Sequence, residues 1–453
     1  MKNIKVSQFN IYLDLEDGAF LLRNLFTDKI TYVTKEKAAY IRTILNSSDI
    51  NLNGEYIYQL YNHGFLINGS KIEYQHVDYF RRSISYSTNN LDITILPTNS
   101  CNFRCAYCFE ETRNLFISDK TAENIISFLD KNMKKYKTVY IQWFGGEPLL
   151  CKDVIDRIMT KACEFSHRDK VALIAGITTN GYELDLETYK KLCRYKTVWI
   201  QISIDGTKET HNLQRPHYND PDSYTKIIEN LKKIRDNTKP SICKIYYRIT
   251  ISKSIIKYID NILLFYKNEF SKDNRFRLSL QPVMDWGGDR VLNMNDDLPN
   301  VEDTIKCLKE AAKYHLMPIG HHTQSSSALI CESTRINSYV FGPGDKVHKC
   351  PMAMYSEIND DLHKSCIGEI LPEGNIKINQ DINIEWVEGT PILGDKCHKC
   401  KYYAICHGNA TCPYSSKYLN KKTIDLCRKP IYDNFIPAEM YLQYMMNDID
   451  YII

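Results

Sequence analysis

Residues 91–110 read "LDITILPTNSCNFRCAYCFE", an apolar run of strand length that leads directly into a loop with three cysteines. Cys101, Cys105 and Cys108 are spaced C-x3-C-x2-C. A disulfide uses two thiols, and a closed tetrahedral metal site uses four ligands. Three thiolates on one loop therefore leave one coordination position open, and we expect a further ligand to bind there.

The order of an apolar strand followed by an amphipathic helix recurs from about residue 92 to residue 285. Six such units predict a parallel sheet that closes or partly closes into a barrel. The predicted strands lie in LDITILPT, KTVYIQWFGG, VALIAGITTNG, KTVWIQISIDG, CKIYYRITIS and FRLSLQPV, and the helices cover residues 120–136, 151–166, 185–194, 222–236 and 254–269.

Polar or glycine-rich motifs follow four of the predicted strands. They are Cys101–Cys108, Gly145–Pro148, Thr179–Gly181 and Ser203–Gly206. Catalytic groups of such barrels lie on loops at the carboxyl ends of the strands. One motif of this kind would be an ordinary turn, but four motifs, one of them the cysteine loop, favour a shared site.

The bulk composition restricts the class of protein. The chain has 453 residues, which favours two or three domains, and its net charge of +3 indicates neither a nucleic-acid nor a membrane partner. It has no apolar run long enough to span a membrane and no secretion signal near its first residue, so we expect a cytoplasmic protein. Thiols stay reduced there, so sixteen cysteines indicate metal or redox chemistry. Isolated cysteines, expected to be inert packing residues, are Cys151, Cys163, Cys193, Cys243 and Cys307.

A second group of cysteines follows residue 330. "CESTRINSYVFGPGDKVHKC" covers residues 331–350, "CHKCKYYAICHGNATC" covers residues 397–412, and Cys366 and Cys427 complete the group. A zinc ribbon is one interpretation of the C-x2-C pair, but it would require another closely spaced pair.

The cysteine loop, "GGEP" at residues 145–148 and "SIDG" at residues 203–206 together resemble the radical S-adenosylmethionine (SAM) enzyme superfamily. The resemblance covers about residues 92–285 and implies an α/β fold with a partial (β/α)6 TIM barrel. It also implies a [4Fe–4S] cluster on Cys101, Cys105 and Cys108, with SAM on the fourth iron. In the family, an electron from this cluster cleaves SAM to a 5′-deoxyadenosyl radical.

The resemblance also implies roles at the strand ends. Glu147 would accept hydrogen bonds from the SAM ammonium, and Arg248 would pair with its carboxylate, unless it forms a structural ion pair instead. It identifies no catalytic base. The implied SAM-binding residues are Tyr107, Gly145, Gly146, Glu147, Pro148, Thr179, Asn180, Ser203, Asp205 and Arg248.

The later cysteines resemble the SPASM extension of these enzymes, which holds two auxiliary [4Fe–4S] clusters. The chain departs from that pattern in Gly344-x5-Cys350 and in the five residues between Cys406 and Cys412. The first auxiliary cluster would use Cys331, Cys350 and Cys412, and the second would use Cys397, Cys400, Cys406 and Cys427. Cys366, a substrate thiol or an open position remain alternatives for the missing ligand.

The segment before the barrel contains a hairpin pattern, "FNIYLDLEDGAFLLRN" at residues 9–24, followed by two short amphipathic helices and "FLIN". This order resembles the winged-helix-like peptide-recognition element of peptide natural-product maturases, which binds a leader peptide as an added strand. A plain packing domain is the alternative. The predicted domains are residues 1–88 for peptide recognition, 89–300 for the partial barrel and 301–453 for the SPASM region.

Together these resemblances imply a radical SAM/SPASM maturase that crosslinks a ribosomally made precursor peptide through a thioether or carbon–carbon bond. Its partners would be that peptide and an electron donor such as flavodoxin or ferredoxin. An anaerobic sulfatase-maturing enzyme is the alternative, but in those enzymes an Asp follows the second SPASM cysteine, where this chain has Pro351. A non-catalytic iron–sulfur carrier or peptide-binding scaffold would not need GGEP or SIDG.

Overall fold

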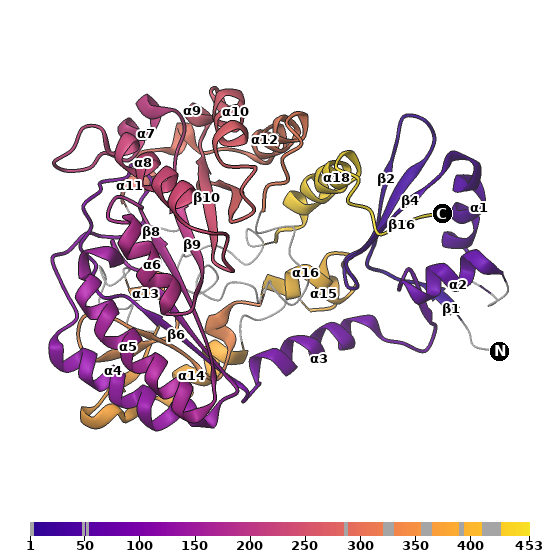
Figure 1. Cartoon of the computed structure of the whole chain (residues 1–453). Coiled ribbons are helices and arrows are strands. Elements are labelled where there is room, and N and C mark those ends of the chain that lie inside the picture. Colours follow the sequence, from indigo (N-terminus) through magenta and orange to yellow (C-terminus); the bar gives the residue numbers. More distant parts are fainter. Residues whose placement is uncertain are drawn as a thin grey trace.

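The computed structural model describes residues 4–47, 50, 54–284, 289–319, 330–354, 365–388, 394–409 and 427–453. Figure 1 shows a larger unit built around one sheet and a smaller unit that holds both labelled ends of the chain. The long helix α3 (Glu73–Ser85) connects the two units. None of the helices in the described stretches is both long and apolar enough to cross a membrane.

The larger unit contains the six parallel strands that the sequence predicts. They lie in the order β11-β10-β9-β8-β7-β6, so each strand pairs with its neighbour in the chain. Residues 245–248 of β10 pair in parallel with both β9 and β11, so the carboxyl ends of these strands lie at one edge of the sheet. The strands are β6 (Asn90–Ile95), β7 (Thr138–Trp143), β8 (Ala172–Thr179), β9 (Thr197–Ser203), β10 (Lys244–Ile251) and β11 (Phe276–Pro282).

Helices follow these strands and cover the sheet, which confirms the predicted alternation. Six of them begin at a side chain that accepts a hydrogen bond from the third backbone amide of the helix and so caps its first turn. These capping residues are Ser118, Asp185, Thr207, Asp222, Ser252 and Asn300. The predicted helix over 254–269 is divided into α9 and α10. The helices are α4 (Asp119–Asn132), α5 (Lys152–Asp169), α6 (Leu186–Arg194), α7 (Lys208–Gln214), α8 (Ser223–Asn237), α9 (Lys253–Ile256), α10 (Ile259–Glu269), α11 (Asp289–Leu292) and α12 (Val301–Lys313).

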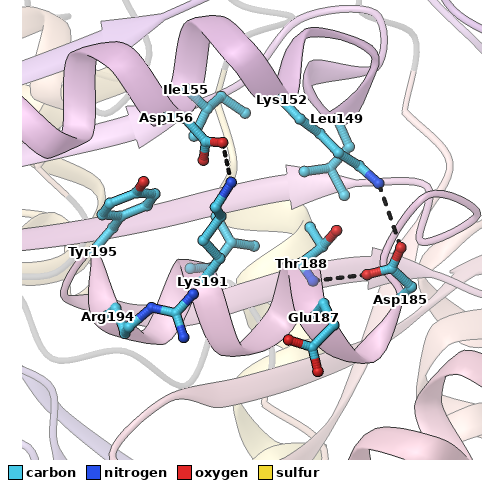
Figure 2. Close-up of a pocket in the computed structure, with 11 residues that line it drawn as sticks. Leu149, Lys152, Ile155, Asp156, Asp185, Glu187, Thr188, Lys191, Arg194 and Tyr195 are labelled. Atoms are coloured by element: carbon cyan, nitrogen blue, oxygen red, sulfur yellow. Dashed lines mark hydrogen bonds and ion pairs between the residues drawn. The ribbon is translucent and has the colours of Figure 1, made fainter.

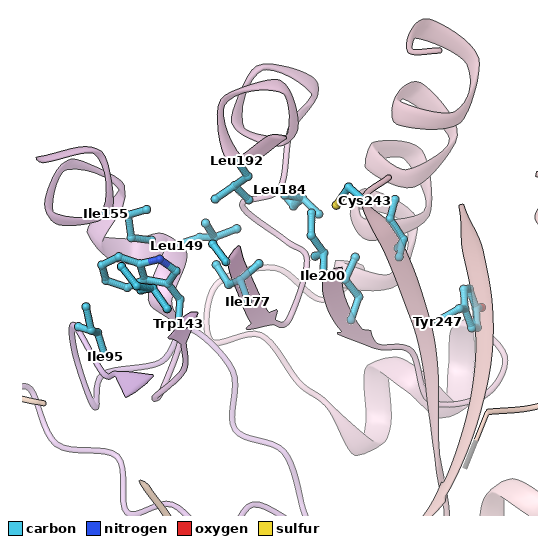
Figure 3. Packing of buried hydrophobic residues seen from close by; sticks show 14 of the residues in the cluster. Ile95, Trp143, Leu149, Ile155, Ile177, Leu184, Leu192, Ile200, Cys243 and Tyr247 are labelled. Carbon is cyan, nitrogen blue, oxygen red and sulfur yellow. The ribbon is translucent and has the colours of Figure 1, made fainter. Parts of the chain in front are cut away.

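The core of this unit lies between the sheet and its helices (Figure 3). Trp143 on β7 and Ile177 on β8 are almost fully buried beside helix residues such as Ile155 and Leu192. Burial of such side chains contributes about 1.5–3 kcal/mol each. The core therefore fixes the positions at which the strands end.

The sheet continues past β6 into the predicted C-terminal region. β12 (Ser338–Phe341) pairs with β6 in parallel, and three antiparallel strands extend it to ten. The predicted boundary near residue 300 therefore divides a continuous sheet. The added strands are β13 (Lys346–His348), β14 (Cys366–Ile370) and β15 (Ile376–Ile378).

The smaller unit begins with the predicted hairpin. β2 (Asn10–Asp14) and β3 (Phe20–Asn24) pair across a turn in which Gly18 has a φ of 89°, a left-handed value that favours glycine. β4 (Lys29–Val33) extends this sheet, and β1 (Ile4–Val6) pairs with β5 (Leu66–Asn68). Two helices complete the unit: α1 (Lys35–Leu45) and α2 (Glu55–Asn62).

The last part of the chain returns to this smaller unit. β16 (Tyr451–Ile452) pairs with β4 in parallel, and α18 (Lys429–Met445) packs against β2, β3 and α12. Arg23 on β3 forms a buried ion pair with Glu439 on α18 at 2.8 Å. The remaining helical elements are η1 (Met133–Lys135), η2 (Pro148–Cys151), η3 (Asn295–Asp297), η4 (Glu332–Thr334), α13 (Pro351–Met354), η6 (Pro372–Gly374), α14 (Gln380–Glu388), α15 (Asp395–His398), α16 (Tyr403–Cys406) and η7 (His407–Asn409).

Candidate functional site

The structure places the predicted SAM-binding residues on five neighbouring strands of the parallel sheet. The cysteine loop follows β6, the GGEP motif follows β7, and Thr179 ends β8. Ser203 ends β9 and lies opposite Arg248 of β10 in the strand register. The site is therefore assembled from residues that lie up to about 150 positions apart in the chain.

The GGEP segment lies directly against the start of the cysteine loop. The Gly146 amide donates to the Thr98 carbonyl at 3.1 Å, and the Glu147 amide donates to the Ser100 carbonyl at 2.9 Å. A Cβ atom added to Gly146 would lie 2.2 Å from the Ser100 carbonyl oxygen. Glycine is required at this position because the two backbones touch.

Glu147 is fully buried and joins the ends of two strands. One carboxylate oxygen accepts from the Leu149 amide at 2.9 Å and the Thr179 hydroxyl at 2.7 Å, and the other accepts from the Asn180 amide at 2.7 Å. Burial raises the pKa of Glu147, and these hydrogen bonds together with Arg215 oppose that shift. Two carboxylate oxygens offer about four acceptor positions, so one remains for a ligand donor.

Asn180 connects the same network to the cysteine loop. Its side-chain amide donates to the Asn102 side-chain oxygen at 2.7 Å, and both residues are buried. Asn102 lies between Cys101 and Cys105, so this contact holds the middle of the loop. The sequence analysis missed Asn102, although its place inside the cysteine motif is a signal that could have identified it.

A second network holds the other end of the loop. The Tyr107 hydroxyl donates to Asp205 and accepts from Arg215. Asp205 is fully buried, also accepts from the Thr250 amide at 2.8 Å, and lies 3.7 Å from Arg215. Arg215 is a site residue that the sequence analysis missed, because no motif spacing marks it.

Two further basic side chains lie near Asp205. Arg248 has a buried Nε atom without a hydrogen-bond partner in the described residues, and burial lowers its pKa although Tyr107 and Asp205 oppose this. His211 accepts from the Asp205 amide at 3.1 Å through Nδ1, and its Nε2 atom is likewise buried without a partner in the part described. Buried polar atoms of this kind are usually satisfied by a ligand or water.

The three thiols of the loop fit an iron–sulfur cluster. All three are free and lie close enough for the charge of one to raise the pKa of another. Burial and the nearby Glu147 raise the pKa of Cys101 to about 12, and burial raises that of Cys108 well above its usual value. Arg215 opposes the same shift at Cys105. The thiols are therefore neutral without metal, and metal binding would release their protons.

Glu110, two residues after Cys108, is a further buried acid that the sequence analysis missed. Burial, with a smaller contribution from Glu147, raises its pKa to about 8. It places a second carboxyl group beside the cysteine loop and the GGEP motif.

Comparison with known proteins identifies the domain that carries this site. Residues 95–253 match the model of the radical SAM superfamily. This stretch of the chain is therefore similar to a radical SAM domain. The match includes the cysteine loop and the strand ends β7 to β10 described above.

The relatives of this chain are named for different activities. The radical SAM cyclopropyl synthase TigE of Paramaledivibacter caminithermalis is 25% identical over 283 residues, which is 56% of each chain. The cysteine-type anaerobic sulfatase-maturating enzyme of Clostridium novyi is 27% identical over 207 residues, 43% of this chain and 53% of its own. The chain thus spans about half the length of these two curated relatives. The corresponding enzyme of Clostridium perfringens strain 13 is 21% identical over 70% of this chain and 88% of its own.

Solved structures share the fold. Native anSMEcpe with bound AdoMet has a TM-score of 0.60 at 18% identity and covers 79% of this chain and 99% of its own. Streptococcus suis SuiB bound to precursor peptide SuiA has a TM-score of 0.50 at 14% identity and covers 89% of this chain and 95% of its own.

Outside the radical SAM domain, four cysteines of the C-terminal region face one small cavity. Cys397, Cys400, Cys406 and Cys427 line it. Within the described stretches, no group of three or more His, Cys, Asp or Glu side chains converges on a single metal-ion position. Four cysteine thiolates are the ligand set of a [4Fe–4S] cluster and also of a structural zinc site, so the chemistry of this cavity fits either metal centre.

The other predicted cluster ligands are less completely placed. Cys350 lies two residues after the end of β13. Cys331 lies close to Lys349, the residue before Cys350, because the charge of the Cys331 thiolate acts to raise the pKa of that lysine. Cys366 lies on β14 and pairs with His348 of β13, and His348 precedes Cys350 by two positions in the chain. Cys412 lies outside the described residues.

A different pocket, of about 300 Å³, lies between α5 and α6 on the outside of the domain (Figure 2). Four of its charged side chains form two ion pairs within the pocket: Lys191 with Asp156, and Lys152 with Asp185 at 3.8 Å. None of the predicted site residues lines it. The strand ends, and not this pocket, therefore form the candidate site.

Proposed function

We propose that this chain is a radical SAM enzyme that modifies a ribosomally made precursor peptide and installs an intramolecular thioether or carbon–carbon crosslink. The observation that carries the proposal is the convergence of four strand ends on a loop with three free, buried or partly buried thiols. When bound there, a [4Fe–4S] cluster and SAM would supply the electron and the radical that abstracts a hydrogen atom.

The residues of this chain would bind and orient SAM. Glu147 would accept from its ammonium with the acceptor position left by its three protein donors. Arg248 would donate to its carboxylate, because its Nε atom is buried without a partner in the described residues. Ser203 and Asp205 lie at the end of β9, where they would accept from ribose hydroxyls.

The C-terminal cysteines would hold two auxiliary clusters. The cavity lined by Cys397, Cys400, Cys406 and Cys427 supports the second of them. The first would use Cys331, Cys350 and Cys412, with Cys366 or a substrate thiol as the fourth ligand. These clusters would accept the electron that crosslink formation releases, and a flavodoxin or ferredoxin would reduce the SAM-bound cluster.

The smaller unit would bind the leader of the precursor. Its strands and helices follow the order expected for a peptide-recognition element. Two structures with the same fold contain peptides: anSMEcpe with the Kp18Cys peptide, at a TM-score of 0.57, and SuiB with SuiA. At 17% and 14% identity these likenesses concern the fold, and they support a peptide substrate only as a class.

Sulfatase maturation is a second candidate function. The Clostridium perfringens sulfatase-maturating enzyme aligns with a larger share of this chain than TigE does, 70% against 56%. Such an activity would oxidise a Cys or Ser of a sulfatase peptide to formylglycine instead of forming a crosslink.

The test is a reaction of the anaerobically reconstituted protein with SAM, a reductant and a candidate precursor peptide, sought as the product of a short open reading frame near its gene. We expect 5′-deoxyadenosine by chromatography, and a peptide that has lost two hydrogen atoms by mass spectrometry. Fragmentation would locate the new bond.

The control is the Cys101→Ala/Cys105→Ala/Cys108→Ala variant, which should form neither product. SAM cleavage with an unmodified precursor, combined with formylglycine in a sulfatase peptide, would support the second candidate. Absence of SAM cleavage by the iron-loaded wild-type protein would refute both.

A further inference from the structure

The sheet of the smaller unit has one edge already occupied by the chain itself. Backbone hydrogen bonds join the β4 edge to residues 450–453: the Asp450 amide to the Ile30 carbonyl at 3.2 Å, the Ile453 amide to the Tyr32 carbonyl at 2.9 Å, and the Thr34 amide to the Ile453 carbonyl at 2.9 Å. The Asp450 carboxylate also accepts from the Ile30 amide at 2.8 Å. The outward donors and acceptors of β4 are therefore used.

Side chains also hold this segment in place. Ile453 is 8% exposed and belongs to the core of the smaller unit, and Tyr451 stacks on His63 at 3.8 Å between ring centres. Lys29 pairs with Asp450 at 3.0 Å. A peptide that added to β4 would have to remove all of these contacts.

At the opposite edge of this sheet, no strand of the described residues pairs with β2. In an antiparallel pair, alternate residues bond to the partner strand. The Leu25 amide donates to Phe9 and the Leu15 amide donates to Ala19, so the odd-numbered residues of β2 bond to β3. The backbone N–H and C=O groups of Tyr12 and Asp14 therefore point away from the sheet.

The β2 edge borders a large groove between the two units. The groove has a volume of about 880 Å³, near the upper end for ligand pockets, and β2, α12 and α18 supply its walls. Figure 1 shows α18 between the β2 hairpin and the larger unit. Its apolar lining includes Leu13 of β2, Ile305 of α12 and Tyr441, Tyr444 and Met445 of α18.

We propose that the β2 edge and this groove bind an extended segment of the precursor peptide as an added strand. The inference rests on the proposed function and assigns the peptide to β2 instead of β4. An added strand would bond to the outward groups of Tyr12 and Asp14, and its alternate side chains would enter the apolar groove.

The charges of the groove indicate the sequence character of that segment. Glu16 and Asp17 lie at the hairpin turn, and Lys309 and Lys313 line the groove from α12. A peptide segment that complements this groove has apolar residues at alternate positions. It has a basic residue at the end beside the hairpin and an acidic residue at the end beside α12. Because the groove reaches the larger unit, a peptide bound there is held beside the radical SAM domain.

The test compares Tyr12→Pro with Tyr12→Ala in the full, cluster-loaded chain. Both changes remove the Tyr12 ring, but only proline removes the outward N–H, and edge strands tolerate it. The probe is the candidate precursor peptide of the test above, labelled with fluorescein. We expect fluorescence anisotropy to give at least tenfold weaker binding for Tyr12→Pro and binding within threefold of wild type for Tyr12→Ala. Unchanged circular dichroism and uncoupled SAM cleavage would show that both variants fold.

Hydrogen exchange of the wild-type protein supplies a second measurement. Saturating peptide should slow exchange of the amides in residues 10–14 and leave residues 450–453 unchanged. Faster exchange in residues 450–453, with full binding by Tyr12→Pro, would overturn the proposal and place the peptide on β4. Absence of any saturable binding would also overturn it. A peptide that binds through Tyr12 but is never modified would instead refute the proposed function alone.

Discussion

The two cysteine-rich regions of this molecule are supported in different ways. The loop of Cys101, Cys105 and Cys108 is held by hydrogen bonds from strand ends, through Asn102 and Tyr107. The cysteines at 397, 400 and 406 lie on or between helices of four residues each, α15 and α16. The first site is thus fixed by a large parallel sheet, and the second by short local structure.

The described residues of the second region pack against the smaller unit and α3. Tyr402, Tyr403 and Ile405 share a buried cluster with strand residues such as Phe9 and Leu21. His398 stacks on Tyr74 of α3 at 4.1 Å. Short helices are marginal alone, so bound metal would contribute much of the stability here. Changes in the loop should therefore affect SAM cleavage, and changes in the second region should affect metal content and stability.

The largest effect is expected from Cys101→Ala/Cys105→Ala/Cys108→Ala. It should abolish SAM cleavage and remove about four of about twelve irons, because one of the three proposed clusters would be lost. Iron analysis and 5′-deoxyadenosine chromatography measure both results. Cys163→Ala, an isolated cysteine of α5, should change neither. An iron content near four in the wild-type protein would contradict the assignment of three clusters.

Gly146→Ala should have the next largest effect. Its new Cβ would lie 2.2 Å from the Ser100 carbonyl oxygen, so the GGEP segment and the cysteine loop must separate. Overpacking of this kind costs about 1–3 kcal/mol, and we expect SAM cleavage to fall about ten- to hundredfold. Gly344→Ala is the control, because its Cβ would meet nothing within 4 Å and only its φ of 85° is strained. Full activity of Gly146→Ala would show that the loop adjusts without loss.

The sequence predicts the first region well for a physical reason. Strands of six to eight residues and helices of nine or more carry a periodic apolar pattern, and the cysteine motif follows the first strand of the series directly. Glu147 and Asp205 also follow predicted strands, so their common location follows from the parallel sheet.

Contacts between distant parts of the chain are not marked by a periodic pattern or a motif in the sequence. β13 and β15 have three residues each, too few for a period of two to be read. β16 has two residues and meets β4 about 420 positions away, as in the hydrogen bond from Thr31 to Tyr451. Arg215 reaches Tyr107 from 108 positions away. Such pairings depend on tertiary packing, which local pattern does not encode.

Glu147→Gln should have an intermediate effect, which we expect in the affinity for SAM. The amide is nearly isosteric but neutral, and hydrogen bonds to a charged group are worth about 1.5–3 kcal/mol. We expect SAM to bind about ten- to hundredfold more weakly by titration, with the cluster spectrum unchanged. Glu111→Gln, at an exposed carboxylate paired with Arg113, is the matched control. Unchanged SAM affinity would assign Glu147 to joining β7 and β8 alone.

The smallest effect on SAM cleavage is expected from Cys397→Ala/Cys400→Ala. These thiols line the second cavity and pack against the core of the smaller unit, so uncoupled SAM cleavage should stay within about twofold of wild type. The protein should nevertheless lose about four irons and melt at a lower temperature, because α16 packs against the core under β2 and β3. Thermal melts monitored by circular dichroism, with Cys163→Ala as control, measure this. Loss of SAM cleavage in a variant that keeps the cluster of Cys101, Cys105 and Cys108 would show that the two regions are coupled. It would contradict the distinction between a first site that is fixed by the sheet and a second site that is fixed by its metal.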